Sequence, residues 1–162
     1  MTDDEIIDRI RDQARPGGLP VPVPVEAVVG LEAAVGHRMP PLLRRIYLEV
    51  ADGGFGRWGA ALSLTEYRDE PPMLEACLAW REGYGAAYPT PVVPLLTWGC
   101  AVWSLIDFST PTGRMWGWDP NGSCLPHSLF PEPFTLSERL TGWLEGREDF
   151  PQPPVRTGCP DC

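Results

Sequence analysis

The sequence predicts a single α+β domain, and three observations support this. The chain has 162 residues, a length that fits one compact domain better than two. Apolar residues recur at helical spacing through the N-terminal half, whereas short runs of branched and aromatic residues follow from Val92 onward. The 20 prolines favour short elements and many turns over a bundle of long helices.

Four helices are expected before the strands. Thr2 and Glu5 have the spacing of a capping box, which begins the first helix, and Pro16 ends it. Prolines at alternate positions then indicate an extended connector. Pro40-Pro41 opens the helix with the strongest apolar face, and Asp52-Gly53-Gly54 ends it with a reversal of the chain. The expected helices cover residues 2–15, 25–36, 40–51 and 73–84.

Strands are expected mainly in the second half. Residues 92–98 and 100–107 are apolar and rich in branched side chains, as buried strands are. Residues 114–119 alternate so that two tryptophans share one face, and an earlier extended segment is expected over residues 58–64. Thr135 and Glu138 form a second capping box, which predicts a last helix that ends at Gly146.

Charge narrows the choice of partners. Thirteen basic residues, all arginine, against 22 acidic ones give a net charge of −9, which repels nucleic-acid backbones and attracts basic proteins. The acidic N-terminus lacks the pattern of a secretory signal, and the longest apolar stretch is broken by Pro94 and Gly99. We therefore expect a cytoplasmic protein with no membrane span, no nucleic-acid partner and reduced cysteines.

Three segments together resemble the SUKH superfamily, which is named partly for a fungal regulator of cell-wall assembly. The segments are residues 31–40, residues 47–54 with the two glycines, and the run from 98 through 119 to the closing helix at 137–146. The resemblance covers about residues 25 to 146. Where the family usually has an asparagine before the two glycines, this chain has Asp52.

The resemblance implies one mostly antiparallel β-sheet packed against helices, and no catalytic activity or cofactor. Many bacterial members are immunity proteins that neutralise a toxin, frequently a nuclease, and fungal members act as interaction scaffolds. We therefore expect residues 23–150 to form a SUKH-like protein-binding domain, preceded by a helix and connector at 1–22 and followed by a tail at 151–162. An intracellular regulatory scaffold is the alternative from the same resemblance.

Five residues are candidates for contact with the partner. Trp116 and Trp118 lie on one strand face and offer an aromatic anchor, although core packing is the competing interpretation. Asp107 and Asp119 end strands, where aspartates also bind turn amides. Asp52 occupies the most diagnostic position of the resemblance.

Four further residues could bind zinc. Cys124 and His127 form one pair with ligand spacing, and Cys159 and Cys162 form another, so a small zinc-binding protein is a third hypothesis. Against an enzyme, the only histidines, His37 and His127, lie near prolines in expected loops, and the sequence has no nucleophile elbow or phosphate-binding glycine loop.

Overall fold

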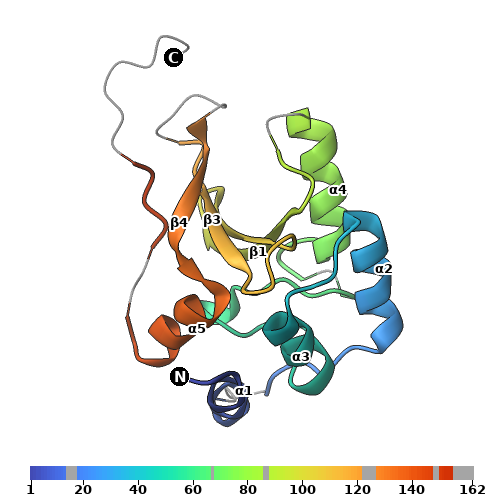
Figure 1. Cartoon of the computed structure of the whole chain (residues 1–162), viewed down its shortest axis with the longest axis vertical. Coiled ribbons are helices and arrows are strands. Elements are labelled where there is room, and N and C mark those ends of the chain that lie inside the picture. The colour runs from blue at the N-terminus through green and yellow to red at the C-terminus, as the bar shows by residue number, and fades with distance from the viewer. Residues whose placement is uncertain (14–17, 67, 86–87, 122–126, 148–149, 155–162) are drawn as a thin grey trace.

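The computed structural model describes residues 1–13, 18–66, 68–85, 88–121, 127–147 and 150–154 (Figure 1). These residues contain helices and one antiparallel four-stranded sheet, joined by loops, which confirms the α+β class and the antiparallel sheet. The helices are α1 (Asp3–Asp12), α2 (Val25–Val35), α3 (Pro41–Glu49), α4 (Met73–Tyr84) and α5 (Leu136–Leu144), with a 3₁₀ turn η1 (Arg57–Gly59). The strands are β1 (Val92–Gly99), β2 (Val102–Asp107), β3 (Arg114–Trp118) and β4 (Leu129–Thr135).

Both predicted capping boxes are present. The Thr2 hydroxyl accepts a hydrogen bond from the Glu5 backbone N–H at 3.3 Å, while the Glu5 carboxylate accepts one from the Thr2 N–H at 2.7 Å. Thr135 and Glu138 form the same reciprocal pair at the start of α5. Each box satisfies N–H groups that a helix start leaves without an internal acceptor.

The sheet has the order β1-β2-β3-β4, so each strand pairs with its neighbour in the sequence. Sequence patterning missed β4, which contains Pro131 and Pro133. Proline cannot donate to a sheet ladder but is tolerated on an edge strand, and β4 is an edge. Beside it, Gly117 is required by packing, because a Cβ atom there would lie 2.3 Å from the Phe130 ring.

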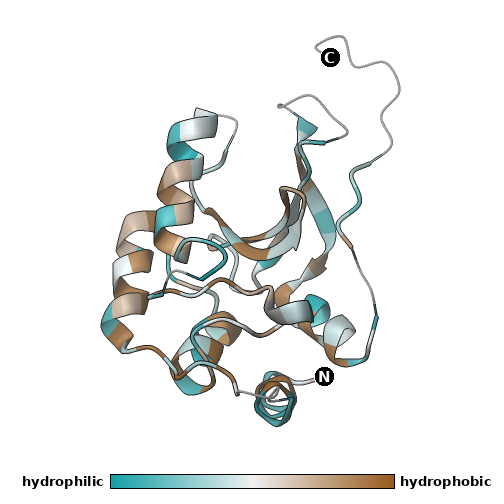
Figure 2. Ribbon diagram, turned by 180° about the vertical axis from the view of Figure 1, so that it is seen from behind, coloured by the Kyte–Doolittle hydropathy of each residue, from teal (hydrophilic) through white to brown (hydrophobic). Residues whose placement is uncertain are grey.

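Helices cover both faces of the sheet. On one face Trp103 pairs with Trp118, and Trp80 of α4 lies with its ring centroid 5.5 Å from Trp103 and 5.2 Å from Trp118. On the other face Ser104 of β2 faces β4 and α5. The helix ribbons alternate between hydrophobic and hydrophilic colours, as expected for helices that bury one face (Figure 2).

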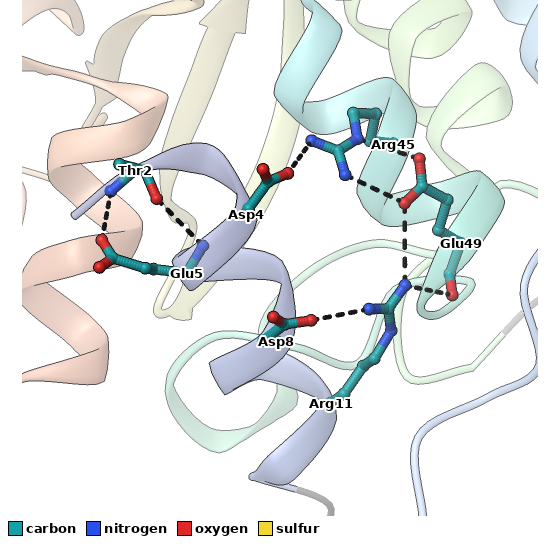
Figure 3. A network of polar contacts seen from close by, with 7 residues as sticks. All are labelled: Thr2, Asp4, Glu5, Asp8, Arg11, Arg45 and Glu49. Atoms are coloured by element: carbon teal, nitrogen blue, oxygen red, sulfur yellow. Dashed lines mark hydrogen bonds and ion pairs between the residues drawn. The ribbon is translucent and has the colours of Figure 1, made fainter.

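The N-terminal helix is part of the same core. From the sequence, residues 1–22 were expected to precede the domain as a separate helix and connector. In the structure the three isoleucines of α1 are at most 1% exposed, and α1 packs against α5 and α3. Ion pairs cover the outer side of its contact with α3: the Arg45 guanidinium lies 2.8 Å from Asp4 and 3.0 Å from Glu49 (Figure 3). The buried isoleucines are Ile6, Ile7 and Ile10.

Candidate partner-binding groove

The chain reverses sharply after α3, at the glycine turn that the sequence predicted. Gly53 and Gly54 have φ of 73° and 72°, a region that glycine enters without strain. A Cβ atom on Gly53 would lie 2.4 Å from the carbonyl oxygen of Leu62, so only glycine lets the two backbone segments approach this closely. The turn therefore places residues 61–65 directly against the end of α3.

Asp52 fixes that arrangement from inside. Asp52 is only 3% exposed. Its carboxylate accepts hydrogen bonds from the Ser63 hydroxyl at 2.6 Å, the Leu64 N–H at 2.6 Å and the Thr65 hydroxyl at 2.5 Å. Asp52 was predicted as a partner-contact residue; burial excludes direct contact. Its carboxylate instead holds the segment that forms the wall of a surface groove.

Trp58 lies at the surface beyond the turn. It sits in η1 with φ of 55°, a left-handed conformation that is uncommon for a bulky residue, and it is 70% exposed. The predicted extended segment over residues 58–64 is wrong for its first part, because the positive φ of Gly56 and Trp58 breaks the extended conformation. Pairing with β1 begins only at Ala60, whose carbonyl accepts from the Thr97 N–H at 3.1 Å.

A groove of about 580 Å³ opens beside Trp58. Its lining combines aromatic side chains with two adjacent carboxylates, Asp69 and Glu70. Arg68 also lines it, but its guanidinium is paired with Glu66 at 2.9 Å. We call this feature the Trp58 groove; its lining consists of Gly18, Leu19, Pro20, Gly54, Trp58, Ala60, Ala61, Leu62, Ser63, Arg68, Asp69, Glu70, Thr97, Trp98 and Gly99.

Glu70 is held in a setting that disfavours its charge. Partial burial raises the pKa of its carboxyl, a hydrogen bond with Thr97 lowers it, and the neighbouring Asp69 carboxylate adds to the rise. A cation in the groove would stabilise the charged form of Glu70, because its attraction would offset both the cost of burial and the repulsion from Asp69. The electrostatics of the groove therefore favour a positively charged ligand.

Comparison with models of protein families, with curated proteins and with solved structures gives no match to this chain. Among the described residues no helix has both the length and the apolar character needed to cross a membrane.

The remaining partner-contact candidates do not gather into one patch. Trp118 is 1% exposed, with its ring centroid 4.5 Å from Tyr84 of α4, so the competing core interpretation is the correct one for it. Trp116 is half-buried and packs against the same core. The two tryptophans do share a sheet face, as predicted, but α4 covers that face at Trp118.

The two strand-end aspartates serve turns. Asp107 accepts hydrogen bonds from the backbone N–H and the hydroxyl of Ser109 at 2.8 and 2.6 Å. Asp119 accepts from the backbone N–H and the side-chain amide of Asn121 at 2.9 and 3.0 Å. Both aspartates therefore occupy the turn-binding role that the sequence offered as their alternative.

The zinc hypothesis falls largely outside the described residues. Cys124, Cys159 and Cys162 are not among them, and His127 is the one member of the predicted set that is. Within the described part of the chain, no three histidine, cysteine or acidic side chains come together to hold a metal ion.

Sequence reasoning missed Trp58 and the carboxylate pair at 69–70. The sequence contains seven tryptophans, and it does not show which of them is exposed, because tertiary packing decides that. One local signal was available: Gly53, Gly54, Gly56 and Gly59 bracket Trp58 closely, and dense glycines make a loop that can display an aromatic side chain.

Proposed function

We propose that this chain is a non-catalytic protein-binding domain, an immunity protein that neutralises a basic, nuclease-like bacterial toxin by covering its substrate-binding face. The observation that carries the proposal is the 70% exposure of Trp58 at an acidic groove. Tryptophan is enriched at the energetic centres of protein interfaces. An exposed, left-handed tryptophan does not serve the stability of the core, so its place at the surface favours a role in binding.

The charge of the chain supports a basic partner. A net charge of −9 attracts a positively charged protein at long range and raises the rate of encounter. Raising the salt concentration should therefore slow association with the partner more than it speeds dissociation, as measured by stopped-flow mixing or surface plasmon resonance. Association rates that do not change with salt would contradict the electrostatic part of the proposal.

Growth rescue tests the function itself. The toxin domain to test is one encoded next to this gene, expressed from an inducible promoter at a level that stops growth. Co-expression of this chain should restore growth, and an unrelated acidic protein of similar size is the matched control. Toxicity that persists in the presence of this chain, at confirmed expression of both proteins, would refute the immunity proposal.

A further inference from the structure

We infer that the Trp58 groove binds an arginine side chain of the protein partner, with the guanidinium held between the Trp58 ring and the carboxylates of Asp69 and Glu70. The inference builds on the proposed function, which supplies the partner, and specifies which chemical group that partner inserts. Its basis is the juxtaposition of an exposed aromatic ring and two neighbouring carboxylates along one groove.

The Trp58 ring already stacks with one guanidinium of the chain itself. The Cζ atom of Arg57 lies 4.0 Å from the centroid of the Trp58 ring, which is the geometry of a cation–π contact. With Arg57 in this position Trp58 is still 70% exposed, so the ring retains surface for a second group. Arg57 lines a separate small cavity with Leu96 and Trp143 and is not part of the groove lining.

The acidic side supplies the complementary charge. Glu66, Asp69 and Glu70 give the loop three carboxylates against the single guanidinium of Arg68, which Glu66 engages. Asp69 and Glu70 line the groove and are next to each other in the chain. Adjacent carboxylates offer several acceptor oxygens to a planar, five-donor guanidinium.

Arginine fits this groove better than lysine. Arginine stacks on aromatic rings and binds carboxylates through two parallel hydrogen bonds, whereas lysine carries a compact and strongly hydrated charge. The groove volume of about 580 Å³ lies within the range in which proteins hold small molecules, about 300–1,000 Å³, so it can admit a whole arginine side chain together with flanking backbone.

A peptide titration tests this directly. The probe is the acetylated, amidated peptide Gly-Arg-Gly-Arg-Gly, followed through the indole N–H resonances of the ¹⁵N-labelled full chain. Peptides with lysine or with citrulline in place of arginine are the comparisons, since citrulline keeps the shape and removes the charge. We expect the arginine peptide to shift the Trp58 indole signal and to bind about tenfold more tightly than the citrulline peptide, with lysine between them.

Variants locate the site. Trp58→Ala and Glu70→Gln should each weaken binding of the arginine peptide by about three- to tenfold. Glu82→Gln is the matched control: it removes one exposed carboxylate from α4, outside the groove. Equal affinity for the arginine and citrulline peptides would overturn the inference, because it would mean that shape alone decides binding. Equal losses of affinity from Glu82→Gln and Glu70→Gln would also overturn it, because they would mean attraction by net charge alone.

The growth assay separates this inference from the proposed function. If the unchanged chain rescues growth and the doubly substituted chain, Trp58→Ala with Glu70→Gln, rescues equally well at matched expression, the groove inference is wrong while the immunity function stands. If the unchanged chain fails to rescue but the arginine peptide binds as expected, the groove is a site for basic segments and the immunity function is wrong.

Discussion

Two buried carboxylates are satisfied in opposite ways. Asp52, in the loop after α3, is surrounded by neutral hydroxyl and N–H donors. Glu132 of β4 forms a buried ion pair with Arg139 of α5 and also accepts from the Ser104 hydroxyl at 2.7 Å. The first arrangement fixes a loop whose outer side forms a groove. The second joins a helix to a sheet, and both of its charged residues are buried. Asp52 therefore shapes a surface, whereas Glu132 holds two core elements together.

The largest effect is expected from breaking the ion pair. Arg139→Met leaves the Glu132 carboxylate buried without its cation, which should lower the free energy of unfolding by about 3–5 kcal/mol. Adding Glu132→Leu should recover more than half of that loss, since an apolar pair carries no buried charge. Urea denaturation of the two variants measures both changes. A double variant as unstable as Arg139→Met would mean that packing, rather than charge, dominates this contact.

The next effect tests the neutral cage around Asp52. Asp52→Asn places an amide N–H₂ among groups that donate hydrogen bonds to a carboxylate here. The free energy of unfolding should fall by about 1.5–3 kcal/mol. Asp107→Asn, at a surface turn, is the control and should cost less than about 1 kcal/mol. Similar losses from both substitutions would contradict the special role of Asp52.

A pH experiment probes the same region. The Tyr47 hydroxyl donates to the Leu62 carbonyl at 2.6 Å beneath the groove wall, and burial, then the Asp52 charge, raises the pKa of this phenol well above its usual value. The unfolded phenol ionises near pH 10 while the folded one stays protonated, so this contribution to stability is complete below about pH 10 and is lost as the pH rises further. Tyr47→Phe should cost about 1 kcal/mol at pH 7 and flatten the decline above pH 10. An unchanged alkaline decline would exclude Tyr47 as its source.

The smallest effect on stability is expected at the groove tryptophan. Trp58→Gly suits the left-handed backbone and should leave the free energy of unfolding unchanged or raise it by up to about 1 kcal/mol. Trp98 also lines the groove, but its indole donates to Ser104 at 2.9 Å and so belongs to the Glu132 network. Trp98→Ala should therefore destabilise the protein by several times more than Trp58→Gly. Equal thermal shifts would remove the distinction between the two tryptophans.

Local rules predicted most of the fold. Capping boxes at Thr2 and Thr135 and apolar stripes gave the helices, because these signals act within a few residues. Strand β4 was not predicted because two prolines in seven residues argue against a strand unless the strand is known to lie at a sheet edge. The groove was not predicted either, because it is lined by residues near 19, 58, 69 and 98. Only the folded chain brings these four segments together.

Amide hydrogen exchange on the full chain, alone and with the toxin domain encoded next to its gene, tests the groove most directly. If the Trp58 groove is the contact surface, the partner should protect the backbone around residues 54–66, 68–70 and 97–99, with little change on the outer faces of α2 and α4. Protection of α2 and α4 with no change around Trp58 would show that the partner binds elsewhere.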